Sequence, residues 1–180
     1  GDFGISLRSG KPLAVEFAER IPVTATLLLG GGAIAFLVSL SFGVTGAISN
    51  GGALDNVLRA VSLVGASTPN FFVAAVLVII FAVTLGWLPS FGGGGGLYSW
   101  ILPWITASVL PASVLSRVVR VNLQEAMSRA FATTGFAKGL TRGGVVVQEA
   151  LPTIAVPFLT TFGAQFALMM VASIVVETVF

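Results

Sequence analysis

The chain has 180 residues, of which 56% are hydrophobic and 9% are charged, and its mean hydropathy is +1.01. Soluble domains carry about 25% charged residues, so this composition excludes an ordinary soluble domain and indicates a membrane protein. The absence of Cys and His from the sequence excludes disulfides, zinc sites built from Cys and His, and haem ligation by His.

The positions of the charged residues predict the membrane-spanning helices. No Asp, Glu, Lys or Arg occurs in residues 21–54, 60–116 or 150–176. A helix needs about 20 apolar residues to cross the hydrocarbon core, where it satisfies its own backbone hydrogen bonds. The first uncharged stretch therefore predicts a span at 23–48, and an external segment, residues 1–22, precedes it.

The second uncharged stretch is interrupted by the sequence GWLPSFGGGGGLYSW, residues 86–100. Consecutive glycines do not hold a helix against their backbone entropy, so this stretch predicts two spans, at 60–85 and 101–119. The third stretch predicts a fourth span at 153–176. Strand alternation is absent over these lengths, so we expect an all-α integral membrane protein, a polytopic helical bundle with about four spans.

Basic residues gather between the third and fourth predicted spans: Arg117, Arg120, Arg129, Lys138 and Arg142. Four aromatic residues flank the uncharged turn at 86–100, as expected of an aromatic belt: Trp87, Tyr98, Trp100 and Trp104. Because cytoplasmic loops carry the excess of Lys and Arg, we expect the connection 120–152 in the cytoplasm and the glycine turn outside. The external start and the abrupt end at IVVETVF predict that the chain is truncated at both ends, with further spans before and after it.

The connection 120–152 has the pattern of two short helices joined by glycines. Four polar residues at i, i+3, i+7 and i+11 share one helical face, so we expect the third span to continue as a helix beyond the membrane: Arg117, Arg120, Gln124 and Ser128. Gly135 and Gly139 then interrupt the helix. Thr141 is a candidate N-cap for a second short helix that ends at Leu151 and Pro152.

This connection resembles the cytoplasmic EAA loop of the membrane subunits of ABC importers, whose pattern is E-A-A, three residues, G, nine residues, then I-x-L-P. Gly139 fits the glycine, and Leu151 and Pro152 follow at the family's spacing. The segment TGFAKGL, residues 134–140, resembles the version found in the dipeptide, oligopeptide and nickel branch. Four positions depart from the pattern, three under E-A-A and one under Ile: Thr133, Thr134, Gly135 and Glu149.

Other segments resemble the same branch in order and spacing. DFGISL followed by ERIPVTATLLL resembles its external entry to the second span, and STPNFFVA, residues 67–74, resembles its S-x-P-x-F signature. LGWLPSFG resembles its external turn, and VVETVF resembles the start of its E-T-V-F-x-x-P-G-L-G element. The resemblance covers nearly the whole chain and implies a further span before Gly1 and another after Phe180.

The resemblance implies the fold of a type I ABC importer permease and a transport function without catalysis in this chain. In that family two such subunits form the pathway for peptides or a related small solute, and an external binding protein delivers the solute. Each permease sets its loop into a cleft on a cytoplasmic ATPase. The implied coupling residues in this chain are Thr133, Thr134, Gly135, Lys138, Gly139, Leu140, Leu151 and Pro152.

The same resemblance implies partners, cofactors and location. The second permease is expected to be a paralogue, and ATP and Mg²⁺ are expected on the partner ATPase, so no cofactor is expected in this chain. The chain carries no P-loop pattern GxxxxGK[ST] of its own. The implied location is the prokaryotic inner membrane, as a multi-pass protein in the lipid bilayer that binds no nucleic acid.

Four residues near the predicted spans are candidates for the translocation path: Pro69, Asn70, Gln165 and Glu177. A structural alternative stays open for each one. Pro69 kinks a span or takes part in gating, and Asn70 and Gln165 line the path or join helices by hydrogen bonds. Glu177 lies at the membrane interface or contacts the solute. Lys138 and Arg142 are topology or headgroup charges, or they contact the ATPase.

An alternative function is a secondary transporter or channel subunit that works without an ATPase. Such proteins usually show charged residues inside the membrane or inverted repeats. Here the predicted spans hold no charge before Glu177, and no inverted repeat is evident. An enzyme or a membrane scaffold is a third possibility, and an enzyme is disfavoured because no nucleophile–base pair or metal-ligand set lies at membrane depth. The sequence leaves the transported solute open.

Overall fold

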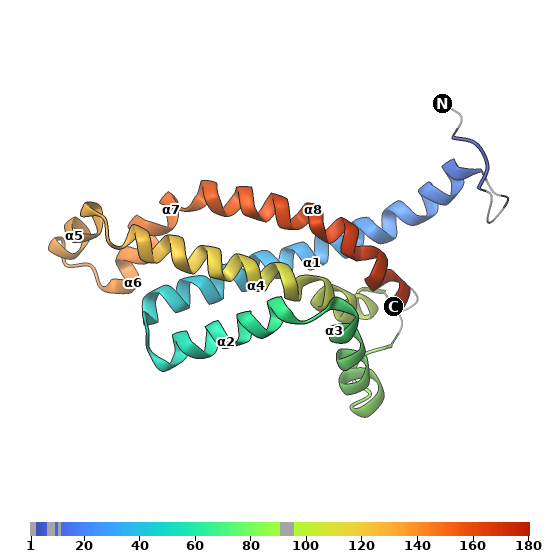
Figure 1. Ribbon diagram of the computed structural model, residues 1–180, viewed down its shortest axis with the longest axis horizontal. Helices are drawn as coiled ribbons and strands as arrows, with labels where there is room; N and C mark the ends of the chain where they lie inside the picture. Colours follow the sequence, from blue (N-terminus) through green and yellow to red (C-terminus); the bar gives the residue numbers. More distant parts are fainter. Residues whose placement is uncertain (1–2, 7–9, 11, 91–95) are drawn as a thin grey trace.

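The computed structural model describes residues 3–6, 10, 12–90 and 96–180, and these residues form a bundle of helices without a sheet (Figure 1). Most of the predicted glycine turn, residues 91–95, lies outside the described residues. Three helices are long and apolar enough to cross a membrane: α1 (Leu13–Ser49), α4 (Ile101–Ala126) and α8 (Ala155–Val179). The predicted all-helical membrane fold class is confirmed.

The helices extend beyond the stretches expected to span. Helix α1 begins at Leu13, within the segment 1–22 that was expected to precede the first span. Helix α4 continues to Ala126, past the expected end at residue 119, as the polar face that includes Gln124 predicts. The connection 120–152 therefore begins with two turns of the same helix rather than with a loop.

The stretch 60–85 is not one straight helix. Helix α2 (Ala53–Ser67) ends before Thr68, and α3 (Asn70–Leu77) continues into the π-helical turn η1 (Val78–Thr84). The two parts meet at an angle of 109°. Pro69 is the physical cause, because its ring excludes the preceding residue from the helical region, and Thr68 is extended, with φ −92° and ψ 126°. The pair is apolar enough to be a broken fourth span.

Helices α1 and α4 pack closely because α1 presents a row of small residues. The row recurs every four residues, and all of its members are buried: Gly31, Ala35, Ser39, Gly43 and Ala47. A Cβ atom on Gly43 would lie 2.4 Å from Cγ1 of Val119 on α4, closer than real contacts allow. Small residues at such spacing let helix backbones approach each other in a membrane, so this row fixes the central pair of the bundle.

Helix α8 lies along α4 and closes the other side of the bundle (Figure 1). Phe36 of α1 contacts Phe158 and Phe162 of α8, with ring centroids 5.1 and 5.4 Å apart. These edge-on aromatic pairs stabilise the packing by about 0.5–1.5 kcal/mol each beyond the area that they bury. The same buried cluster reaches Ala47 and Leu123 at the far ends of α1 and α4.

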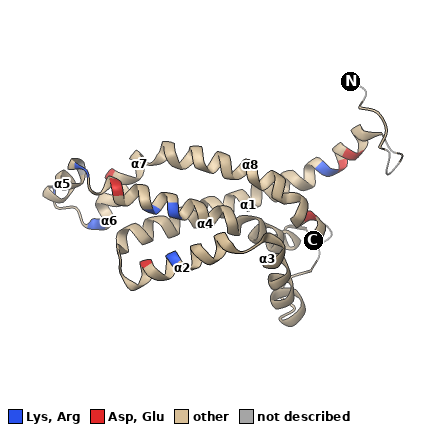
Figure 2. Cartoon of the chain, in the orientation of Figure 1, with Lys and Arg blue, Asp and Glu red and all other residues tan. Residues whose placement is uncertain are grey.

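Charged residues are concentrated at the two ends of the bundle (Figure 2). One end carries α5 and α6, the start of α2 and the last turns of α4; we call it the loop end. The other end carries the first turns of α1 and the last turn of α8. The uncharged zone between them matches the expectation for a chain whose helices cross a bilayer.

Candidate functional site

The candidate site is the folded segment that joins α4 to α8 at the loop end (Figure 1). It consists of four short helices in succession: α5 (Ala130–Ala137), α6 (Arg142–Val145), the π-helical turn η3 (Val146–Ala150) and α7 (Leu151–Thr153). The predicted arrangement of two short helical pieces about a glycine bend is present, and the second piece is a chain of α6, η3 and α7.

Gly139 makes the bend by ending α5 in a left-handed conformation. Its φ is +84°, and its N–H donates to the carbonyl of Phe136 at 2.9 Å while the N–H of Leu140 donates to the carbonyl of Gly135 at 3.2 Å. This pair of bonds defines the Schellman motif, which favours glycine because an L side chain is strained there. The helix-cap role of Gly139 is thus established in the structure, and any docking role is additional to it.

The second helical piece starts where the sequence predicted. The side chain of Thr141 accepts a hydrogen bond from the N–H of Gly144 at 3.2 Å, which makes Thr141 the N-cap of α6. An N-cap hydroxyl satisfies one of the free amides of the first turn. The bend and the cap together fix the direction in which the chain returns to the bundle.

One face of α5 is packed against α6. Ala132 and Gly135 are buried, and a Cβ atom on Gly135 would lie only 3.0 Å from Cγ2 of Val145. Gly135 occupies the second Ala position of the family pattern. The close contact between α5 and α6 leaves little room for a side chain at this position. Its side of α5 faces inward and is not available to another protein.

The other face of α5 is exposed and, with the bend that follows it, carries four more of the predicted residues, whereas Leu140 after the bend is half-buried. Thr133, Thr134, Lys138 and Gly139 are all exposed. Phe136 lies among them with 45% of its surface exposed. A Cβ atom built on Gly139 would meet nothing within 4 Å apart from its chain neighbours, so the backbone there is open. Exposed aromatic residues beside open backbone are typical of contact surfaces. Sequence reasoning missed Phe136, although an aromatic residue in so polar a segment was a usable signal.

The two basic residues of the bend have different surroundings. The ammonium of Lys138 lies 3.8 Å from Oε1 of Glu149, so this exposed pair bridges α5 and η3. Arg142 points inward and donates from Nη2 to the carbonyl of Ala47 at the end of α1, at 3.3 Å. Exposed pairs stabilise by at most about 1 kcal/mol, so Lys138 stays available for a partner, whereas Arg142 attaches the segment to α1.

The last two predicted coupling residues lie where the segment rejoins the bundle. Leu151 is partly buried and packs against the cluster that contains Val146 and Ala150, and Pro152 is exposed in the first turn of α7. Proline fits that position because its missing N–H is free there in any helix. Val146 and Ala150 are fully buried, so the return path from the bend is fixed in the core.

A buried carboxylate near this segment joins α2 to α4 and to the turn between α1 and α2. Asp55, on the first turn of α2, is fully buried and accepts two bonds from Arg120 of α4, at 2.5 Å to Oδ1 and 2.7 Å to Oδ2. The N–H of Gly51 donates to Oδ2 at 2.8 Å. Gly46 of α1 leaves room for the pair, since a Cβ there would lie 3.1 Å from Cδ of Arg120. Neither the partner nor the burial was foreseen from the sequence.

The environment of Asp55, which precedes the uncharged stretch 60–116, favours its ionised form. The hydrogen bond from Arg120 lowers the pKa of the carboxyl to about 2 against an ordinary 3.8, although burial opposes the shift. A carboxyl whose folded pKa lies below its unfolded value stabilises the fold above the unfolded pKa. Its contribution is therefore complete above about pH 4 and is lost as the pH falls toward 2.

The four residues predicted for the translocation path are spread over the molecule. Pro69 and Asn70 are at the bend between α2 and α3, and Gln165 lies on α8 about 18 Å before Glu177 along the helix axis. Glu177 lines a cavity of about 630 Å³ at the end opposite the loop end, where Thr24 donates to its Oε1 at 2.7 Å. Pro69, Asn70 and Gln165 do not line this cavity, and the path role of all four stays a prediction.

Comparison with known proteins identifies the family. Residues 22–180 match the family described as "Binding-protein-dependent transport system inner membrane component". The chain belongs to this family of inner-membrane transport components, in agreement with its apolar helices and with the resemblance of its loop.

Curated relatives with the printed name "Glutathione transport system permease protein GsiC" cover the entire chain. The protein of Escherichia coli (strain K12) is 32% identical over 180 residues, and that of Salmonella choleraesuis (strain SC-B67) is 34% identical over the same length. The relative in Shigella flexneri serotype 5b (strain 8401) is 32% identical. The chain spans 58% of the length of each of these relatives.

Proposed function

We propose that this chain forms the membrane core of a permease subunit of an ATP-driven importer and couples to a cytoplasmic ATPase through α5 and the Gly139 bend. The observation that carries the proposal is the exposed face of α5, on which Phe136 lies beside the open backbone of Gly139. The opposite face of the same helix is fixed against Val145. A polar surface with an exposed aromatic residue and rigid support suits docking to another protein.

The anchoring of this surface supports a lever mechanism. Arg142 holds the segment to the end of α1, and η3, with the fully buried Val146 and Ala150, packs against α1 and α4. A displacement of α5 would therefore move the ends of the long helices as one body. ATP binding that closes the ATPase pair would favour one of two arrangements of the helices, which is a population shift between two states.

The partners and the solute follow from the family and its relatives. We infer an external binding protein that delivers the solute, a pair of cytoplasmic ATPase subunits that bind ATP and Mg²⁺, and a second permease that is a paralogue. Because the relatives carry the name of a glutathione transport permease, we propose a peptide-like solute and glutathione as the first compound to test. ATP hydrolysis belongs to the ATPase subunits in this proposal, so the chain itself is not an enzyme.

Reconstitution tests the proposal. The full-length protein, its paralogue, the ATPase subunits and the binding protein are placed in liposomes, and uptake of labelled glutathione is measured. We expect uptake only with ATP on the ATPase side and with the binding protein present, and we expect loaded binding protein to raise ATP hydrolysis.

Two controls separate the alternatives. A non-hydrolysable ATP analogue should abolish repeated transport while leaving the complex assembled. Uptake that needs an ion gradient but neither ATP nor the binding protein would support the secondary transporter and contradict the proposal.

A further inference from the structure

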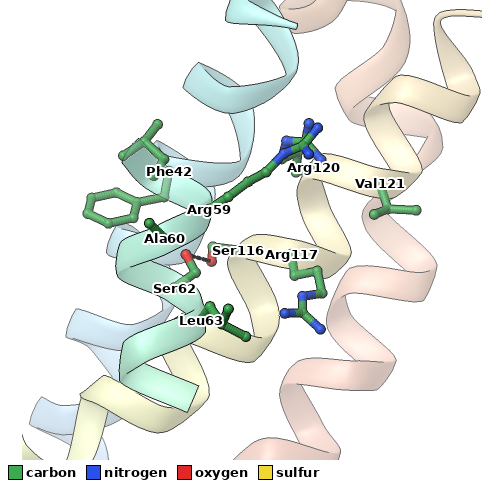
Figure 3. Close-up of a pocket in the computed structure, with 10 residues that line it drawn as sticks. Phe42, Arg59, Ala60, Ser62, Leu63, Ser116, Arg117, Arg120 and Val121 are labelled. Carbon is green, nitrogen blue, oxygen red and sulfur yellow. Dashed lines mark hydrogen bonds between the residues drawn. The ribbon is translucent and has the colours of Figure 1, made fainter. Parts of the chain in front are cut away.

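Three arginine side chains line one pocket between α2 and α4 (Figure 3). The pocket encloses about 410 Å³, and six of its lining residues matter here: Phe42, Arg59, Ser62, Ser116, Arg117 and Arg120. Figure 3 shows that Arg59 reaches toward Arg120, whereas Arg117 lies apart from both. The hydroxyls of Ser62 and Ser116, which also line the pocket, form a hydrogen bond of 2.9 Å. We refer to this hollow as the arginine pocket.

The arginine pocket has an excess of positive charge. Its three guanidinium groups have one nearby carboxylate, that of Asp55, which gives a net charge of +2. Arg120 takes both oxygens of Asp55, whereas Arg59 lies 3.4 Å from one oxygen and stays 54% exposed. Arg117 is exposed and forms no ion pair with any described residue. Two cationic groups are therefore available to an anion that enters the pocket.

The position of the pocket along the bundle matches the depth of lipid headgroups. Arg59 and Arg117 are the residues that bound the uncharged stretch 60–116 on its two sides. Apart from the turn 86–100, that stretch comprises the parts of α2, α3 and α4 that are apolar enough for the hydrocarbon core. Arginines at its border lie where phosphate groups lie, and basic pockets between helices at this depth suit anionic headgroups.

The surroundings favour an amphiphile over a water-soluble anion. Two large hydrophobic side chains that line the pocket are exposed: Leu63 of α2 at 55% and Val121 of α4 at 50%. A second, apolar cavity of about 490 Å³ shares Phe42 and Ser62 with the arginine pocket and continues along α2 to Thr68. A lipid whose headgroup lies in the arginine pocket would place its acyl chain along this second cavity.

We propose that the arginine pocket binds the headgroup of an anionic phospholipid, which Arg59 and Arg117 attract from two sides of the pocket while Arg120 is held in place by Asp55. In the orientation that the proposed function requires, this lipid belongs to the cytoplasmic leaflet. The bound lipid joins α2 to α4 next to the segment that carries α5. This role is separate from ATPase docking, because the two sites share no residue.

Lipid binding by the purified full-length protein tests this proposal. The probes are dioleoyl-phosphatidylglycerol and dioleoyl-phosphatidylcholine at equal concentration in detergent, and the readouts are the shift in Tm and the lipid retained in native mass spectra. We expect the anionic lipid to raise Tm and the zwitterionic lipid to leave it nearly unchanged. The double variant R59Q/R117Q should bind the anionic lipid roughly 30-fold more weakly, since each arginine near the membrane surface contributes about fivefold in affinity.

The control variant is R129Q, which removes an exposed arginine near the loop end outside the pocket. It should bind the anionic lipid as the unaltered protein does, and both variants should elute as folded protein. Equal weakening by R129Q and by R59Q/R117Q would show general charge attraction and overturn the proposal. Inorganic phosphate that binds with the affinity of the lipid would also overturn it, because the pocket would then be a site for a free anion.

Discussion

Replacing Gly139 with Trp should reduce ATP-driven transport by roughly tenfold or more while the protein still inserts and folds. The indole would occupy the open space beside the bend, since a Cβ atom built on Gly139 meets nothing within 4 Å apart from its chain neighbours. A docked ATPase would have to move away from it, and overpacking of this kind costs about 1–3 kcal/mol, which is roughly 5- to 150-fold in affinity. Transport in liposomes and co-purification of the ATPase measure the effect.

A matched control separates docking from backbone strain. Gly51 has φ +85°, close to the +84° of Gly139, and also has open space around it, but it lies in the turn between α1 and α2. Gly51→Trp introduces a similar backbone strain, about 1–2 kcal/mol for an L residue in this conformation. The hydrogen bond from the N–H of residue 51 to Asp55 is kept. It should transport almost normally. Equal loss in both variants, or normal transport by Gly139→Trp, would remove the coupling role of the bend.

Replacing Asp55 with Ala should destabilise the protein by about 3–5 kcal/mol, because it leaves the Arg120 guanidinium buried without a partner. Asp55 is fully buried, and the Arg120 side chain is only 12% exposed. The turn after α1 also loses the acceptor for the Gly51 N–H. Thermal unfolding and the yield of folded protein in detergent give the measurement.

Two further variants decide whether the cost comes from the buried charge. The double variant Asp55→Leu/Arg120→Met removes both charges and should recover much of the loss, since apolar replacement of a buried pair is often neutral. Glu125→Ala breaks an exposed pair, with Arg129 at 2.9 Å, and should cost at most about 0.5 kcal/mol. A cost for Asp55→Ala as small as that for Glu125→Ala would contradict the structural role of the buried pair.

Local features of the sequence predicted the parts of the structure that depend on local physics. The charge-free stretches located the long helices, because hydrophobic length alone decides whether a helix can span. Gly139 and Thr141 located the bend and the cap, since left-handed turns and N-caps are properties of a few consecutive residues. The fold class and the family followed from these local signals together.

Contacts between residues far apart in the chain could not be predicted from the sequence. Asp55 and Arg120 lie in different helices, and nothing in either segment marks the other as its partner. Arg142 looked like a surface charge, yet it donates to the carbonyl of Ala47 on α1. Pro69 was expected either to kink a span or to take part in gating. The size of the observed bend, 109°, could not be predicted, because α3 also packs against α4 and α8.

Single-cysteine labelling at Phe136 tests the central claim most directly, since the chain has no native Cys. The full-length Phe136→Cys variant in a cysteine-free background is treated with a membrane-impermeant maleimide in inside-out and right-side-out vesicles, with and without the ATPase. We expect labelling only in inside-out vesicles and at least roughly tenfold slower labelling once the ATPase is bound, because a docked protein excludes the reagent. Trp87→Cys lies in the turn 86–100 that is expected outside, and the Trp87 side chain is 61% exposed. This variant should label only from the outside. Labelling of Phe136→Cys from the outside, or at the same rate with and without the ATPase, would contradict the assignment of α5 and its bend as the coupling surface.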